Sequence, residues 1–191
     1  MAYQTYITEA IVCGSRASNT SDGVFLLFTR DAGMIHAHAR SVREEKSKHR
    51  YALQPFSYLR ITLVRGKGGW RIIGTESIQN FYSETSTREA RSFLRNTTIL
   101  LRRVMRGETA HPEIFDDIIC ANMQSNKQNP EKLEQILFLR TLNTLGYVPP
   151  QPLYESLLTS DIPYDNVGEL STEVTNKCKD AVEYALQQSQ L

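Results

Sequence analysis

The sequence has 191 residues, of which 40% are hydrophobic and 23% are charged, a composition typical of a folded globular protein with one domain or two small ones. These proportions exclude a largely disordered chain, a collagen-like chain and a mini-protein held by disulfides. The formal net charge of +1, taken alone, argues against a protein that binds nucleic acid.

The cysteines and the hydropathy indicate a cytoplasmic protein. Cys13, Cys120 and Cys178 are far apart and odd in number, so they predict neither a disulfide framework nor a four-cysteine zinc site. Free thiols suit a reducing cytosol. No apolar run approaches the roughly 18–20 residues that cross a bilayer, and residues 1–12 lack the features of a signal peptide. We expect no membrane contact, no metal and no cofactor.

The first 80 residues contain five stretches with the hydrophobic pattern of β-strands. Turn residues separate them, including Asp31–Gly33 and the glycine-rich hairpin connection Arg65–Gly69. Five short strands in this length favour a small β-barrel or sandwich. The stretches are residues 7–13, 23–29, 34–39, 56–64 and 70–78.

The longest connection between these strands is the basic insert, residues 40–55. In a five-stranded oligonucleotide-binding (OB) barrel, the connection between strands three and four usually carries a short helix. The glycine-rich turn before Trp70 would join strands four and five. Loops of this kind flank the binding face of the fold.

From about residue 83 the hydrophobic period becomes helical. A first helix is predicted after candidate caps at Ser83, Ser86 and Thr87, and it ends near Gly107. Three more follow: one opened by His111-Pro112 with Met123 inward, one from Asn129-Pro130 to Gly146, and one over residues 171–188. The sequence therefore predicts an α+β protein, with an N-terminal five-stranded OB-fold β-barrel over residues 1–80 and an α-helical domain over residues 81–191.

The net charge conceals an uneven distribution along the chain. Residues 1–82 hold 11 basic and 6 acidic residues, whereas residues 83–191 hold 11 basic and 15 acidic ones. Six arginines lie between positions 88 and 106 against one acid, and beyond Arg106 five bases face 13 acids. Such asymmetry is typical of a face that binds a polyanion, although solvated charges can cluster by chance.

Basic residues and aromatic residues alternate around the insert and the hairpin, as they do in proteins that bind single strands. Lys and Arg neutralise phosphates, and rings stack on bases. Tyr51, Phe56, Tyr58 and Trp70 are the aromatic residues, but strand spacing favours the core for the last three. The candidate DNA contacts are Arg30, Arg40, Arg43, Lys46, Lys48, Arg50, Arg65, Lys67 and Arg71 on the barrel, with Arg88 and Arg91 on the first helix.

The two helical candidates admit a second interpretation. Arg88, Arg91 and Arg95 are spaced i, i+3 and i+7, so they share one helical face. That face could contact phosphates or could simply be solvated.

No constellation of residues indicates catalysis. His36 and His38 share a strand face, but a surface or core pair is a better interpretation than a metal site because no supporting ligand has a suitable spacing. The glycines around Lys67 lack the phosphate-loop pattern. Asp116 and Asp117 are interpreted as a solvated helix face.

Residues 11–77 resemble the N-terminal OB domain of the recombination and DNA-repair protein O (RecO) family. The resemblance rests on the order of A-I-V from Ala10, L-F-T-R-D-A-G at 27–33, A-L-Q-P-F at 52–56 and R-G-K-G-G at 65–69. In the helical half, L-R-T-L-N-T-L-G-Y-V-P at 139–149 is similar to the family's L-G-Y-x-P segment. Many members have four zinc-binding cysteines after that segment; here they are missing, so the resemblance implies a short form without zinc. Glu44 and Glu45 dilute the charge of the insert.

The resemblance implies a non-enzymatic role in recombinational DNA repair. Such proteins bind single- and double-stranded DNA, promote annealing of complementary strands, and work with RecR to help RecA displace single-stranded-DNA-binding protein. A nucleoid-associated location would follow. Contact with the acidic tail of the single-stranded-DNA-binding protein would need a basic groove in the helical domain. Arg102, Arg103 and Arg140 are candidates for this groove.

Two alternatives stay open. An OB barrel that contacts the backbone could bind RNA as well as DNA. Alternatively, the acidic helical half could act as an adaptor that recruits partners, with the barrel as a scaffold.

Overall fold

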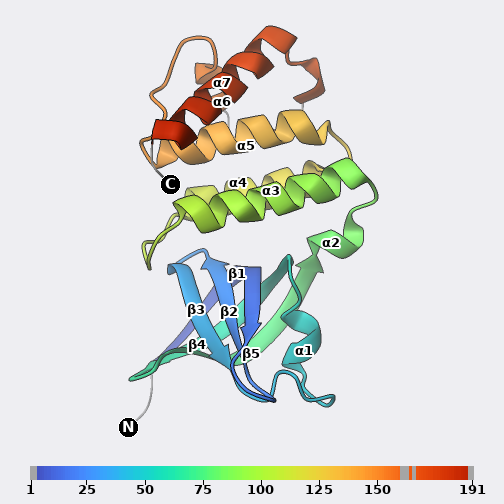
Figure 1. The fold of residues 1–191 in the computed structure, drawn as a ribbon, viewed down its shortest axis with the longest axis vertical. Helices are drawn as coiled ribbons and strands as arrows, with labels where there is room; N and C mark the ends of the chain where they lie inside the picture. Colours follow the sequence, from blue (N-terminus) through green and yellow to red (C-terminus); the bar gives the residue numbers. More distant parts are fainter. Residues whose placement is uncertain (1–3, 160–163, 165–166, 189–191) are drawn as a thin grey trace. The chain divides into compact units, whose positions relative to one another are not determined.

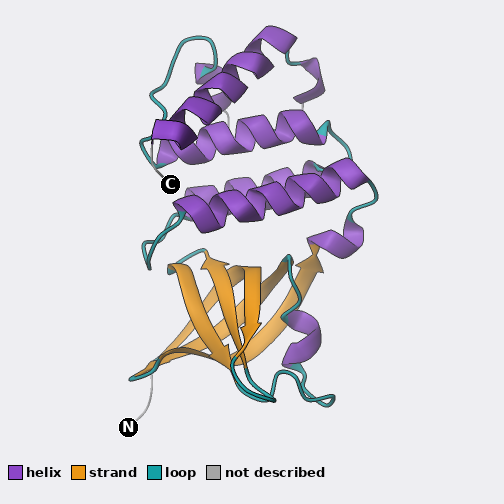
Figure 2. Cartoon of the chain, viewed as in Figure 1, coloured by secondary structure: helices purple, strands orange, loops and turns teal. Residues whose placement is uncertain are grey.

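The computed structural model describes residues 4–159, 164 and 167–188. The chain forms two compact units. We call them the barrel unit, which is Met1–Glu84 with Met105–Phe115, and the helical unit, which is Thr85–Val104 with Asp116–Leu191. The strands belong to the barrel unit (Figures 1 and 2).

Five strands close into a barrel in the order β1-β2-β3-β5-β4. Neighbouring strands are antiparallel except β3 and β5, whose short parallel pairing closes the barrel. The five strands expected from the sequence are confirmed, and most extend a few residues further. Their bounds are β1 Thr5–Ala17, β2 Gly23–Thr29, β3 Gly33–Ala39, β4 Ser57–Gly66 and β5 Gly69–Asn80.

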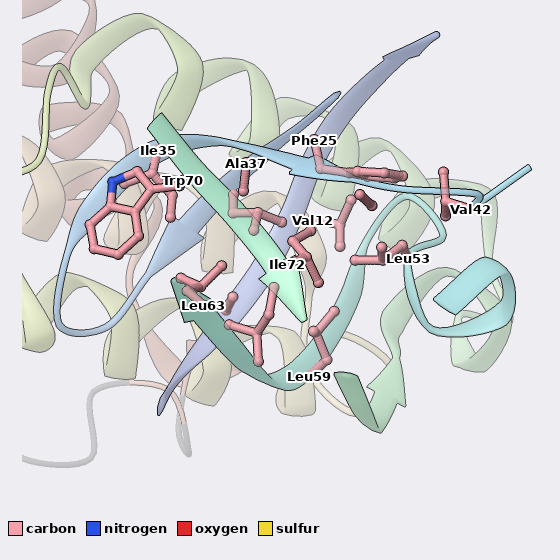
Figure 3. Packing of buried hydrophobic residues seen from close by; sticks show 14 residues of the cluster. Val12, Phe25, Ile35, Ala37, Val42, Leu53, Leu59, Leu63, Trp70 and Ile72 are labelled. Atoms are coloured by element: carbon pink, nitrogen blue, oxygen red, sulfur yellow. The ribbon is translucent and has the colours of Figure 1, made fainter. Parts of the chain in front are cut away.

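The core of the barrel follows the period of two that the sequence shows. On β3, Ile35, Ala37 and Ala39 are buried, whereas His36 and His38 between them are exposed. Figure 3 shows side chains from every strand meeting in one cluster. The cluster comprises Ala10, Val12, Phe25, Leu27, Ile35, Ala37, Ala39, Val42, Leu53, Leu59, Ile61, Leu63, Trp70 and Ile72.

The basic insert, residues 40–55, contains the expected short helix, α1 (His49–Ala52). Val42 and Leu53 of the insert join the barrel core. The His49 Nδ1 lies 2.9 Å from Thr75 Oγ1, which ties α1 to β5. The insert is therefore packed on the barrel. A second short helix, α2 (Phe81–Glu84), follows β5.

Residues 105–115 group with the barrel, although the sequence assigned them to the helical domain. The Met34 backbone N–H donates to the Gly107 carbonyl at 3.0 Å. Gly33 has φ +65°, and a Cβ at this residue would lie 2.3 Å from the Thr109 carbonyl oxygen. Phe115 is fully buried, with its ring centroid 5.7 Å from that of Phe28. These contacts explain why the segment belongs to the first unit.

The predicted long helices are confirmed, and the Thr87 hydroxyl caps the first by accepting from the Ala90 N–H at 3.1 Å. The Asn129 side chain caps α5. Met123, expected inward, is instead 49% exposed, one residue from the end of its helix. None of the helices in the described ranges is long and apolar enough to span a membrane. The elements are α3 Arg88–Val104, α4 Pro112–Gln124, α5 Pro130–Thr144, α6 Glu155–Thr159, the 3-10 helix η1 Val167–Glu169 and α7 Thr172–Gln188.

Candidate nucleic-acid interface

A hollow of about 330 Å³ lies beside the β4–β5 hairpin, and we call it the basic pocket. Its lining includes Arg40 at the end of β3, Lys67 in the hairpin and Arg71 near the start of β5. The parallel pairing of β3 with β5 sets His38 opposite Arg71 and thereby brings these segments together. Three cationic side chains from two distant stretches of the sequence thus converge at one place.

The carboxylate in the described lining of this pocket, that of Asp22, is held by hydrogen bonds. Its Oδ1 accepts from the Ser41 N–H at 2.8 Å, and its Oδ2 accepts from Asn19 Nδ2 at 2.9 Å. The hydrogen bond from the Ser41 N–H is the main cause that lowers the pKa of the Asp22 carboxyl, and the hydrogen bond from Asn19 is the second. The side chain therefore connects the β1–β2 loop to the start of the insert.

Arg43 reinforces the same connection. Its Nη1 donates to the Asn19 carbonyl at 3.1 Å, and its backbone N–H donates to the Ser21 carbonyl at 2.9 Å. Arg43, which the sequence predicts to contact phosphate, thus also has a structural role, because it holds the insert against the β1–β2 loop.

Arg65 and Trp70 form a second cluster at the hairpin. The Arg65 guanidinium lies 5.1 Å from the Trp70 ring centroid, and its Nη1 is 2.7 Å from Glu108 Oε2. Trp70 is buried and meets the Tyr6 ring edge to face at 5.1 Å. A phosphate at Arg65 would compete with the Glu108 carboxylate, so this arginine is the less available of the hairpin cations.

The other predicted barrel cations divide into two places. Lys46, Lys48 and Arg50 are exposed along the insert. Arg30 lies in a different hollow that also contains Glu9 and Asp31, and its Nη1 is 3.9 Å from Glu9 Oε2. The structure therefore does not bring Arg30 to the basic pocket.

Arg88 and Arg91 belong to the helical unit, where both are exposed on α3. Arg91 Nη2 donates to the Thr85 carbonyl at 3.4 Å. Arg88 borders a hollow whose lining includes Glu131 and Glu134. The helical period that places the two arginines on one face is confirmed, and a role in DNA contact stays a prediction.

The expected assignment of aromatic residues to the core holds for Tyr58 and Trp70, which are buried. Phe56 is half-buried, and Tyr51 is 76% exposed. Sequence reasoning missed Tyr82, whose ring stacks on that of Phe56 with centroids 6.0 Å apart. Its position at the strand-to-helix junction carried no periodic signal.

The position of Asp117 in the helical unit differs from the sequence-based expectation. Asp117 was interpreted as part of a solvated face, but its Oδ2 accepts from Arg140 Nε at 2.7 Å in a largely buried ion pair. Burial raises the pKa of Asp117 despite the hydrogen bond from Arg140. Arg140 also donates to the carbonyls of Leu157 and Leu158. Its role here is therefore to hold α4, α5 and α6 together.

The other two arginines considered for contact with an acidic tail, Arg102 and Arg103, are exposed on α3. Arg103 Nη2 donates to the Leu186 carbonyl at 2.8 Å. Within the described part of the chain, no group of three or more His, Cys, Asp or Glu side chains could hold a metal ion.

A closed five-stranded barrel with a short helix between β3 and β4 defines an OB-fold protein with a helical extension. Residues 1–81 match the family model for the N-terminal domain of recombination protein O. The barrel of this chain is thus similar to the N-terminal domain of the RecO family.

Three curated relatives show how far the similarity extends, and each is described as "DNA repair protein RecO". The one from Dehalococcoides mccartyi is 28% identical over 143 residues, which are 74% of this chain and 56% of the relative. The one from Caldanaerobacter subterraneus is 35% identical over 74% of this chain and 58% of the relative. The one from Alkaliphilus metalliredigens is 26% identical over 87% of this chain and 67% of the relative. The chain thus spans little more than half the length of the first two.

Proposed function

We propose that this chain is a non-enzymatic DNA-binding protein of recombinational DNA repair. In this proposal, the barrel unit holds single- and double-stranded DNA by its phosphates, on the basic pocket and the exposed cations of the insert. The match of residues 1–81 to the family model, and the name "DNA repair protein RecO" that the relatives carry, support a repair role.

The observation that carries the proposal is the convergence of Arg40, Lys67 and Arg71 in one pocket. Cations gathered in a concave site raise the local potential and attract a polyanion more strongly than the same cations dispersed. Each phosphate that displaces condensed counterions adds favourable entropy. The hydrogen-bonded Asp22 lowers the net charge of the pocket only in part, since three cations face it.

Strand annealing follows from the same chemistry. A surface that binds phosphates screens the repulsion between two complementary strands and brings them together. We further propose that the chain works with RecR to load RecA on DNA coated with single-stranded-DNA-binding protein. The exposed Arg102 of α3 is available for an acidic partner segment.

Titration of a fluorescently labelled single-stranded oligonucleotide at several salt concentrations tests the phosphate contacts. Binding should weaken steeply with salt. Lys67→Ala should weaken binding of every sequence alike and reduce the slope of log K against log salt by about 0.7. Lys179→Ala is the matched control, because it removes an exposed lysine from α7 of the helical unit and should change neither quantity.

Binding that barely responds to salt, or an equal effect of both lysine variants, would contradict the electrostatic proposal. Competition with an RNA oligonucleotide of the same sequence separates a DNA-binding from an RNA-binding barrel. Replacing Lys46 and Lys48 with Glu should abolish annealing. An unchanged annealing rate would favour the adaptor interpretation instead.

A further inference from the structure

A second hollow in the barrel unit, of about 520 Å³, is lined by aromatic side chains, and we call it the aromatic pocket. Tyr51 comes from α1, Phe56 lies between the insert and β4, and Tyr82 comes from α2. Gln54, Pro55, Asn80 and Ser83 complete the lining. The pocket therefore forms where the insert meets the end of β5.

The rings in this pocket are accessible to a ligand. Tyr51 is 76% exposed and Tyr82 is 49% exposed. The Phe56 and Tyr82 rings lie nearly parallel, with 19° between their planes. Exposed aromatic residues gathered in one hollow are unusual on a soluble surface and mark a binding site. Parallel ring faces suit a flat ligand that stacks.

The backbone holds Phe56 in a costly conformation. Its φ is +64°, in the left-handed region that bulky residues rarely adopt. Its N–H donates to the Val12 carbonyl at 3.0 Å, and its carbonyl accepts from the Phe81 N–H at 3.3 Å. The barrel thus fixes the residue between β1 and α2. Strain of this kind concentrates at ligand sites, because the surrounding structure must maintain it.

The surroundings of the pocket are basic, and hydrogen bonds connect the segments that line it. Arg50 precedes Tyr51 in α1, and Lys46 and Lys48 lie just before the helix. Gln54 of the pocket donates from Nε2 to the Arg50 carbonyl at 2.6 Å. Asn80 Nδ2 donates to the Pro55 carbonyl at 3.1 Å and so ties the pocket to β5. Cations beside flat apolar rings match the chemistry of a nucleotide.

We propose that the aromatic pocket stacks an unpaired nucleobase of the strand whose phosphates lie on Lys46, Lys48 and Arg50. This inference rests on the proposed DNA binding and adds a site that accepts single strands and excludes paired ones. A base within a duplex already has its faces covered by its neighbours, so it cannot stack on Tyr51 or Tyr82. The pocket would thus distinguish single-stranded from double-stranded DNA, whereas the basic pocket would bind both.

β5 sets the spacing of the two sites. It runs from Trp70 and Arg71 at the basic pocket to Asn80 at the aromatic pocket, roughly 30 Å at the usual rise per strand residue. A single strand that follows β5 would contact phosphate-binding cations at one end and stack a base at the other.

The test compares ring removal with charge removal in the full chain. The probe is a labelled single strand of mixed sequence and about 20 nucleotides, long enough to follow β5. It is compared with the duplex of the same sequence and with a strand of the same length that is abasic at every position. Tyr51→Ala and Tyr82→Ala should each weaken single-strand binding about tenfold. They should leave duplex binding and the salt slope unchanged. Tyr51→Phe should retain binding, because it keeps the ring.

Two controls exclude trivial explanations. Tyr184→Ala removes a tyrosine of the helical unit that is 66% exposed and should have no effect. On the abasic strand, the wild-type chain and Tyr51→Ala should bind alike, because no base remains to stack. The fluorescence of Trp70, the one tryptophan of the chain, reports whether each variant keeps its barrel.

Other results would overturn the inference. If Tyr51→Ala and Tyr82→Ala bind the single strand as the wild-type chain does while Lys67→Ala shows its reduced slope, the pocket is no base site and the proposed DNA binding stands. If no chain binds DNA, both proposals fail. If DNA binding is unchanged but the variants lose self-association in sedimentation, the pocket belongs to a second copy of the chain.

Discussion

The barrel unit and the helical unit use their charged side chains in different ways. On the barrel, Arg40, Lys67 and Arg71 line an open pocket. In the helical unit, Arg140 pairs with Asp117 in a largely buried ion pair. Lys132 Nζ likewise donates to the carbonyls of Gly168 and Leu170. The cations of the basic pocket are thus available for a ligand, whereas Arg140 and Lys132 hold segments of the helical unit together.

The structural units also modify the charge asymmetry of the sequence. Counted by unit, the barrel has 12 basic and 9 acidic residues, and the helical unit has 10 and 12. The difference is smaller than that between the two halves of the sequence, because residues 105–115 bring two acids to the barrel unit and Glu84 adds a third. Long-range attraction to DNA should therefore be weak. Affinity must depend on local convergence of cations.

The largest expected effect concerns the extent of the barrel unit. Phe115 is fully buried and lies against Phe28 and Tyr58. Phe115→Ala should lower the free energy of unfolding by about 4 kcal/mol, because it leaves a cavity among these rings. Urea unfolding followed by Trp70 fluorescence measures the loss in the barrel itself.

Met123→Ala is the control on the same helix, since Met123 is 49% exposed and should cost less than about 0.5 kcal/mol. If both variants unfold at the same urea concentration in the fluorescence measurement, residues 105–115 do not stabilise the barrel, and the comparison of the two units must be redrawn.

Local patterns predicted the elements, but contacts between distant residues decided the sites. The period of two on β3 placed His36 and His38 on one face, which the structure shows to be exposed, and the glycine-rich hairpin followed from residues 65–69. No local pattern could show that Arg40 and Lys67 line one pocket, because the parallel pairing of β3 and β5 brings their segments together. The burial of Asp117 likewise depends on Arg140, which is 23 residues away.

A smaller effect tests the structural use of charge between the helices. Arg140→Ala should lower the free energy of unfolding by about 3 kcal/mol, because it leaves the Asp117 carboxylate buried without its partner. Far-UV circular dichroism in urea gives the value. The folded variant should bind single-stranded DNA as the wild-type chain does, in contrast to Lys67→Ala.

Arg102→Ala serves as the matched arginine control, because Arg102 is exposed on α3 and should change stability by less than about 0.5 kcal/mol. Equal stability of the two arginine variants would mean that the buried ion pair does not distinguish the helical unit from the barrel.

The smallest effect is a loss of stability of the helical unit in alkaline solution. Burial raises the pKa of the Cys178 thiol from its usual 9.0 to about 11. The unfolded chain therefore releases the thiol proton at a lower pH than the folded chain does. The stability that the neutral thiol contributes is complete below pH 9 and is lost as the pH rises from about 9 to about 11. Tyr154, whose pKa burial also raises, adds to the loss at higher pH.

Urea unfolding of the wild-type chain and of Cys178→Ala at neutral pH and above pH 10 isolates the thiol. The variant should be less stable at neutral pH, because it loses buried volume, but its stability should fall less with pH. If both chains lose stability in parallel, the thiol makes no contribution, and the alkaline sensitivity belongs to other groups.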